Sequence, residues 1–155
     1  MHAPCAPELL DYCDEVGYLI WAEIPIWQSV YRAPMNTLEE ASRASANLPG
    51  RQLREVIGRD DNHHCIIGWS PGNELRHEAC AYVEAMRPFV KTQDSTRLYA
   101  AVHDQNFDMK SDGGFRGMNA AHVDLLLMDK YADTKTKIQT VLKQHKAVSH
   151  LSVFY

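Results

Sequence analysis

The chain has 155 residues, of which 45% are hydrophobic and 23% are charged, as in an ordinary globular domain with a core of its own. Its formal net charge of −4 argues against the basic surface that attracts nucleic acid. No apolar run approaches the roughly 20 residues of a membrane helix, and the first residues lack the pattern of a signal peptide. We therefore expect a cytoplasmic protein that binds neither nucleic acid nor a membrane.

Strand-like and helix-like segments alternate along the chain, which is the pattern of a parallel α/β protein. Four segments have the apolar spacing of helices: 7–16, 51–60, 78–91 and 134–144. Five short apolar runs are typical of strands buried on both faces: 18–23, 65–70, 98–102, 123–128 and 147–154. Pro7 and Gly17 mark the start and the end of the first helix, and Pro88 is expected to bend or shorten the third.

Five strands with intervening helices fit two architectures, an open doubly wound sheet and part of a barrel. Periodicity alone does not choose between them. No Gly-x-Gly-x-x-Gly motif or phosphate-binding loop follows any of the predicted strands, which weakens the nucleotide-binding alternative. We therefore expect no cofactor.

The cysteines are expected to pack as small apolar residues rather than to form disulfides or bind zinc, because none belongs to a Cys-x-x-Cys pair. They are Cys5, Cys13, Cys65 and Cys80. His63 and His64 are adjacent and cannot easily bind one ion together, so we expect no metal site. A hydrogen bond that closes the loop before the next strand is the expected role of His63.

Polar side chains gather where the predicted strands end, and these ends carry the functional residues in both architectures. The first four strands deliver Glu23, Ser70, Asn73, Glu74, His103, Asp104, Asp129 and Tyr131. Carboxylates, an amide, an imidazole and a phenol suit a polyhydroxylated substrate, and a carboxylic acid can protonate a leaving oxygen. Trp27, in a loop, is a candidate for stacking on a sugar ring.

The residues around Glu74 resemble a known family. Residues 59–64 have the sequence Arg-Asp-Asp-Asn-His-His. They precede a predicted strand that ends in Trp-Ser-Pro-Gly-Asn-Glu at residues 69–74. This order is similar to the acid/base segment of glycoside hydrolase family 2, which includes β-galactosidases, β-glucuronidases and β-mannosidases. Weaker matches follow the same family in the right order, at residues 2–4, 10–17, 21–25, 95–97 and 129–131.

The resemblance implies a partial (β/α)8 TIM barrel that spans approximately strands three to seven. Residues 1–155 would form a single incomplete catalytic domain, without the preceding sandwich domains or the last strand, because a complete barrel takes about 250 residues. The implied activity is that of a retaining exo-β-glycosidase of the β-galactosidase or β-glucuronidase type, which hydrolyses O-glycosidic bonds in a β-linked glycoside or oligosaccharide.

The resemblance also assigns roles to individual residues. Glu74 would be the general acid/base, kept protonated by apolar surroundings, and Asn73 would bind the sugar 2-hydroxyl. His2 would line the sugar subsite, and Tyr131 would orient the nucleophile. His103 is a candidate for substrate binding, with ordinary loop polarity as the alternative. For Glu74 itself, the alternative is a solvated surface carboxylate.

Three positions depart from the family's pattern. In the best match, residues 151–155, Val153 stands where the nucleophilic Glu is expected, and valine cannot attack an anomeric carbon. The alternative is that the segment with the nucleophile lies beyond Tyr155. His64 replaces the usual Pro, and Asp129 replaces the usual Asn. We therefore expect a fragment that has little turnover by itself. The alternative is a non-catalytic carbohydrate-binding or assembly module, which associates with itself or with a complementing chain through exposed strand edges.

Overall fold

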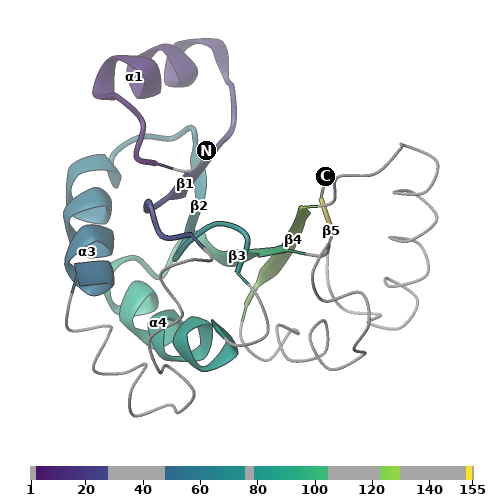
Figure 1. The fold of residues 1–155 in the computed structure, drawn as a ribbon. Helices are drawn as coiled ribbons and strands as arrows, with labels where there is room; N and C mark the ends of the chain where they lie inside the picture. The colour runs from purple at the N-terminus through teal and green to yellow at the C-terminus, as the bar shows by residue number, and fades with distance from the viewer. Residues whose placement is uncertain (1–2, 28–47, 76–78, 105–122, 130–152, 155) are drawn as a thin grey trace, which may run out of the picture.

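A computed structural model describes residues 3–27, 48–75, 79–104, 123–129 and 153–154, and the elements keep the labels of Figure 1. Three helices are described: α1 (Pro7–Val16), α3 (Leu48–Asp60) and α4 (Cys80–Gln93). Five strands are described: β1 (Ile20–Glu23), β2 (Ile66–Ser70), β3 (Leu98–Asp104), β4 (Leu125–Asp129) and β5 (Val153–Phe154). The predicted helix over 134–144 and most of the predicted strand over 147–154 lie outside the described residues.

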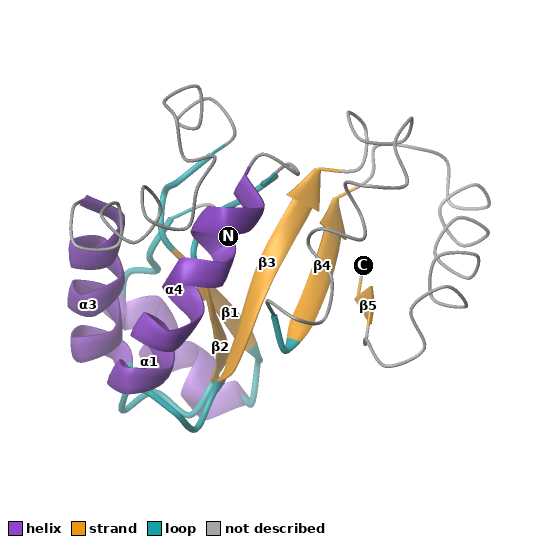
Figure 2. Ribbon diagram, turned by 90° about the horizontal axis from the view of Figure 1, so that it is seen from below, coloured by secondary structure: helices purple, strands orange, loops and turns teal. Residues whose placement is uncertain are grey.

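The described strands form one parallel sheet in the order β1-β2-β3-β4-β5, so each strand pairs with the next one along the chain. A doubly wound sheet reverses its strand order at a switch point, whereas a (β/α) barrel adds strands in sequence. α3 and α4 cover the same side of the sheet (Figures 1 and 2). The arrangement confirms a parallel α/β fold and favours the barrel over the doubly wound alternative.

Helix α1 has the bounds predicted from its sequence. Pro7 stands in its first turn, and Gly17 ends it in the left-handed conformation with φ 70°, where its N–H bonds to the carbonyl of Cys13. Leu10 and Cys13 are buried on the inner face. Cys5, Cys13 and Cys65 are buried and not bonded to one another, as expected of small apolar residues.

Helix α4 contains Pro88 and continues to Gln93, two residues beyond the predicted end at residue 91, so the proline does not shorten it. An interior proline costs a helix about 3 kcal/mol. The face that packs against the core extends beyond the proline, since Met86 and Val90 are both fully buried. Packing of this face outweighs the local cost, which is how most helices in proteins are stabilised.

The core between sheet and helices is built around Trp69, which is fully buried. Its indole N–H donates to Asp94 Oδ2 at 2.8 Å, at the C-terminal end of α4, and the Arg97 guanidinium lies 5.6 Å from its ring centroid. The neighbouring Gly68 faces the other way, where a Cβ atom would lie 2.3 Å from the Trp21 ring. Neighbouring residues of β2 therefore face opposite sides of the sheet. The Trp69 indole faces the helices, and Gly68 faces the side on which the Trp21 ring packs.

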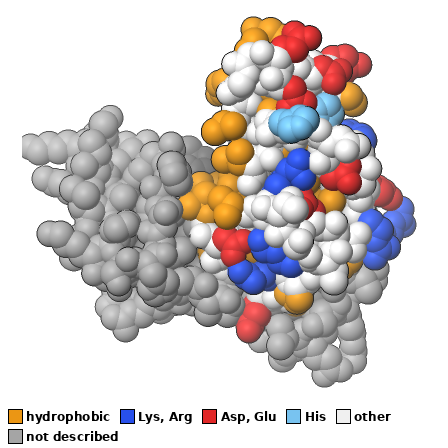
Figure 3. Space-filling view, turned by 180° about the vertical axis from the view of Figure 1, so that it is seen from behind, with side chains coloured by type: hydrophobic (Ala, Val, Ile, Leu, Met, Phe, Trp, Pro, Cys, Tyr) orange, Lys and Arg blue, Asp and Glu red, His pale blue; other side chains and the backbone are white. Residues whose placement is uncertain are grey.

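The surface of the described part mixes acidic and basic side chains, with apolar side chains along one edge (Figure 3). The most exposed large apolar residues are Tyr18, Leu19, Tyr12, Leu48 and Val16. Among the described helices, none combines the length and the apolar character that crossing a membrane requires.

Candidate active site

The carboxyl ends of β1 and β2 are joined by side chains as well as by the backbone. The strand register places Glu23 beside Ser70, and both residues are buried. The Ser70 hydroxyl lies 2.9 Å from Glu23 Oε2, to which it can donate. A hydroxyl also accepts, and the Gly72 N–H donates to Ser70 Oγ at 3.3 Å. Ser70 therefore fixes the start of the turn that follows β2.

Gly72 lets this turn approach the segment after β1. A Cβ atom at position 72 would lie 2.8 Å from the carbonyl oxygen of Ile26, so a side chain does not fit. The next residue, Asn73, donates its backbone N–H to that same carbonyl at 2.8 Å. On the opposite side, the Tyr82 hydroxyl of α4 donates to the carbonyl of Pro71 at 2.9 Å. The turn is held from both sides.

Trp27 and Glu74 meet through this turn. Trp27 forms an isolated parallel bridge with Asn73, beyond the ends of β1 and β2. Its indole Nε1–H donates to Glu74 Oε2 at 2.6 Å, although the two residues are 47 positions apart. Glu74 is 5% exposed, whereas Trp27 is 49% exposed. A buried carboxylate is thus held by the edge of a half-exposed indole.

Glu74 has an unusual backbone conformation. Its φ of 48° is the only positive φ of a non-glycine residue among the described residues. A side chain in this region costs of order 1–3 kcal/mol, and such strain clusters at functional sites. The next residue is anchored, because the fully buried Leu75 donates its N–H to the carbonyl of Val102 in β3 at 2.7 Å. The neighbouring contacts hold Glu74 in one orientation.

This arrangement can move a proton. A carboxyl group gives or takes a proton efficiently when it is held in a fixed position near the reacting atoms. Glu74 is held by a strained backbone and by an indole donor, and it follows the carboxyl end of a parallel strand, where active sites of such sheets lie.

Three of the predicted site residues come together here, namely Glu74, Asn73 and Trp27. His103 lies in β3, opposite Met128 of β4, near the same end of the sheet, but its side chain is not described. His2 and Tyr131 lie outside the described residues. The structure thus brings together the predicted site residues that follow β1 and β2.

Two contacts were not predicted from the sequence, the bond from Trp27 to Glu74 and the bond from Ser70 to Glu23. Both join residues 47 positions apart, and no local motif signals them. The predicted pairing of neighbouring parallel strands could have suggested the second one, because it places the last residues of the two strands side by side.

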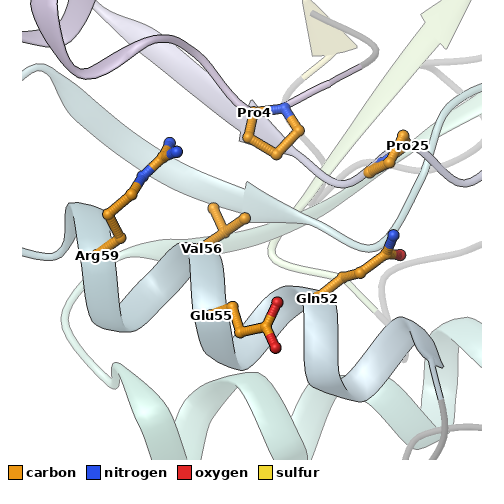
Figure 4. A pocket seen from close by; sticks show the side chains of 6 residues that line it. All are labelled: Pro4, Pro25, Gln52, Glu55, Val56 and Arg59. Carbon is orange, nitrogen blue, oxygen red and sulfur yellow. The ribbon is translucent and has the colours of Figure 1, made fainter.

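A cavity of about 400 Å³ lies apart from these residues, between α3 and the segments of Pro4 and Pro25 (Figure 4). The helix contributes Gln52, Glu55, Val56 and Arg59 to its wall. Arg59 pairs with Asp60, and the exposed Glu55 lies 3.8 Å from Arg51. None of the predicted site residues lines this cavity.

Asp14, His63 and Cys65 place ligand-type atoms within 4.8 Å of one another. These groups already bond among themselves. His63 Nδ1 lies 2.8 Å from one oxygen of Asp14, and the other oxygen accepts the Cys65 N–H at 2.6 Å. Burial raises the pKa of the Cys65 thiol to about 12, so the thiolate that binds metals is disfavoured. We interpret the cluster as a set of hydrogen bonds that connects α1 to the start of β2. The predicted hydrogen bond of His63 is confirmed.

Parallel strands in sequential order, with a buried carboxyl group beyond the end of one of them, are the arrangement found in (β/α) barrels. The comparison with known families narrows this class. The family described as "Glycosyl hydrolases family 2, TIM barrel domain" matches residues 1–151. The chain belongs to this family of β-galactosidase- and β-glucuronidase-type glycosidases.

Curated relatives carry names from both groups. A β-galactosidase of Thermoanaerobacter pseudethanolicus is 38% identical over 68 residues, which are 44% of this chain and 8% of the relative. A putative β-glucuronidase of Formosa agariphila is 32% identical over 113 residues, which are 72% of this chain and 10% of the relative. The chain therefore spans about a tenth of the length of these relatives.

Solved structures share the fold. The β-glucuronidase of Bacteroides uniformis superposes with a TM-score of 0.72 at 19% sequence identity, over 99% of this chain and 19% of the other. A β-glucuronidase of Faecalibacterium prausnitzii gives a TM-score of 0.66 at 23% identity, over 98% of this chain and 27% of the other.

Proposed function

We propose that these 155 residues are the middle of the catalytic barrel of a retaining exo-β-glycosidase, of the β-galactosidase or β-glucuronidase type, with Glu74 as its general acid/base. One observation carries the proposal. In a chain of this family, Glu74 is a buried carboxyl group with a strained backbone, located after the carboxyl end of β2 and bonded to Trp27. A solvated surface carboxylate has none of these features.

The proposed chemistry uses Glu74 twice. In the first step its carboxylic acid gives a proton to the glycosidic oxygen as the leaving group departs, while a second carboxylate attacks the anomeric carbon. In the second step the Glu74 carboxylate takes a proton from water, which then displaces the enzyme from the sugar. The two carboxyl groups of a retaining enzyme lie about 5–5.5 Å apart.

The remaining site residues are proposed to bind the sugar. Asn73 is adjacent to Glu74 and 5% exposed, which suits a bond to the 2-hydroxyl. His103 lies near the end of β3 and is proposed to face a neighbouring subsite. His2 and Tyr131 keep the roles that the family resemblance gives them, in the sugar subsite and beside the nucleophile.

We further propose that β1 to β5 correspond to barrel strands three to seven, within a single incomplete domain over residues 1–155. The unbroken strand order supports this numbering. β5, Val153–Phe154, pairs with β4, which supports the proposal that Val153 stands at the position of the nucleophile. The isolated chain should therefore have little or no turnover.

The same valine favours a second candidate function, a non-catalytic carbohydrate-binding or assembly module. Such a module would keep the sugar-binding residues and bind a β-glycoside without cleaving it, by itself or with a complementing chain. The two candidates differ in whether a longer natural chain containing these residues hydrolyses a glycoside.

The test compares the isolated chain with the natural protein that contains it, using p-nitrophenyl β-galactoside, β-glucuronide, β-glucoside and β-mannoside. We expect turnover of at least one substrate by the natural protein and none by the isolated chain. Glu74→Gln should remove the turnover, and Glu55→Gln, on the exposed surface of α3, should not. Binding without turnover in both samples would favour the non-catalytic module. Turnover by the isolated chain would show that another carboxylate, such as Glu23, replaces the missing nucleophile.

A further inference from the structure

We infer that Trp27 is a positioning residue for Glu74, because its indole N–H donates to Oε2 and holds the carboxyl group in one orientation. The inference rests on the proposed role of Glu74, and extends it by naming the residue that orients its carboxyl group. Stacking on a sugar, the role expected of Trp27 from its sequence, would use the ring face and not the N–H, so the two roles are compatible.

The chemistry of the two groups gives the bond its direction. An indole N–H is a donor only, so Glu74 Oε2 must be the acceptor. The donor and acceptor atoms are 2.6 Å apart. A carboxylate oxygen accepts such a bond more strongly than the oxygen of a neutral carboxylic acid does, so the bond should change when Glu74 titrates.

The backbone holds both partners in register. Trp27 forms its bridge with Asn73, the residue directly before Glu74, and the Asn73 N–H bonds to the carbonyl of Ile26, directly before Trp27. The indole and the carboxyl group thus extend from adjacent points of one short ladder. The positive φ of Glu74 occurs directly after this bridge.

The indole also acts on the proton affinity of Glu74. Burial of a carboxyl group favours its neutral form, whereas a hydrogen bond donated to the carboxylate favours the charged form. An acid/base group that works in both directions needs these effects in balance. Other titratable groups near this end of the sheet are Glu23 at the end of β1, which Ser70 contacts, and His103, Asp104 and Asp129 in β3 and β4.

Nuclear magnetic resonance of the indole N–H groups tests the inference without any turnover. The chain has three tryptophans, so three indole signals are expected. The Trp27 signal should shift with pH along the titration of Glu74, and Glu74→Gln should abolish the shift. The Trp69 signal is an internal control, because hydrogen bonds hold the pKa of its partner Asp94 far below the usual range despite its burial.

A second measurement follows Glu74 itself, through the ¹³C signals of its carboxyl carbon. Trp27→Phe keeps an aromatic ring but removes the donor, so the midpoint of the Glu74 titration should rise by about one pH unit. Trp21→Phe is the matched control, since the Trp21 indole N–H has no partner among the described residues, and it should leave the midpoint unchanged.

The outcomes separate this inference from the proposed function. A Trp27 signal that ignores the titration of Glu74, or an unchanged midpoint in Trp27→Phe, would overturn the inference even if Glu74→Gln abolishes hydrolysis. Hydrolysis that survives in Glu74→Gln would overturn the proposed function, and the assignment of Trp27 with it, even if the indole signal titrates.

Discussion

At the scale of single residues, the strained backbone of Glu74 sets a conflict between stability and function. A φ of 48° suits glycine and disfavours every residue that has a Cβ atom. The protein nevertheless places a glutamate there, in a turn that also depends on Gly72 and Ser70. Residues that keep such strain are expected where a carboxyl group is needed in one orientation.

A pair of substitutions measures this strain. Glu74→Gly and Glu74→Ala both remove the carboxyl group and its bond to Trp27, but only alanine keeps a Cβ atom. We expect the glycine variant to be more stable than the alanine variant by about 1 kcal/mol, measured by urea unfolding. In an ordinary helix the order is reversed, so an alanine variant of equal or greater stability would show that the backbone at Glu74 is unstrained.

The sequence predicted the members of the site better than it predicted their contacts. Glu74 and Asn73 follow from the motif around Trp69, and Trp27 follows from being an aromatic residue in a loop. The bond from Trp27 to Glu74 could not be predicted, because it depends on the turn at Gly72 bringing two loops within hydrogen-bonding distance. Sequence patterns report local periodicity and carry no signal for such a contact.

At the scale of elements, contacts at the opposite end of the sheet hold the strands in place. Arg97, before β3, donates to the carbonyls of Ile66, Asp61 and His63 at 2.7 to 2.9 Å, and to the Asp94 carboxylate at 2.8 Å. One planar guanidinium thus joins the ends of α3, α4 and β2. The flat fork of arginine suits this set of acceptors in a way that a lysine ammonium does not.

Arg97→Lys should therefore destabilise the fold although the charge is kept. We expect a loss of about 3 kcal/mol in the free energy of unfolding, because several carbonyls and the buried Asp94 lose their donors together. Arg51→Lys is the matched control. Its ion pair with Glu55 is exposed on both sides, and the substitution should change stability by less than about 0.5 kcal/mol in the same urea titration. Equal effects of the two substitutions would contradict this role of Arg97.

The hydrogen bonds of Asp14 in α1 with His63 and Cys65 should make the free energy of unfolding depend on pH. The hydrogen bond from His63 lowers the pKa of Asp14 from 3.8 to about 2. A carboxyl group with a lowered pKa in the folded state adds stability above its unfolded pKa and loses it as the pH falls through the folded value. The urea midpoint should therefore fall between about pH 4 and pH 2. Asp14→Asn should flatten this fall, and an equally steep fall in the variant would assign it to other groups.

Among the described residues, the predicted bounds of an element agree best with the structure where local signals mark both of its ends. Helix α1 has its predicted bounds, because proline and glycine mark both ends. Helix α3 begins three residues before its prediction, since Pro49 fits the first turn of a helix rather than the preceding loop. Pro88 does not shorten α4 as expected, because tertiary packing of this helix outweighs the local signal of the proline.

At the scale of the whole molecule, the order of the strands in the sheet distinguishes a barrel from a doubly wound sheet, which the periodicity of the sequence does not. The sequence left a doubly wound sheet and a barrel as alternatives, and only the family resemblance chose between them. The parallel order β1 to β5 and the family match over residues 1–151 now agree. A sheet of this kind places all strand ends at one edge, which is why residues from distant segments can share one site.

The central claim is that Glu74 gives a proton to the leaving group, and its most direct test varies that leaving group. The longer protein that we propose contains this chain is assayed, with and without Glu74→Gln, on a methyl β-glycoside and on the 2,4-dinitrophenyl glycoside of the same sugar. We expect the variant to lose about 10²- to 10⁴-fold in kcat/KM on the methyl glycoside, whose alkoxide must be protonated, and far less on the dinitrophenyl glycoside, which leaves without a proton. Equal losses on both substrates would contradict the claim.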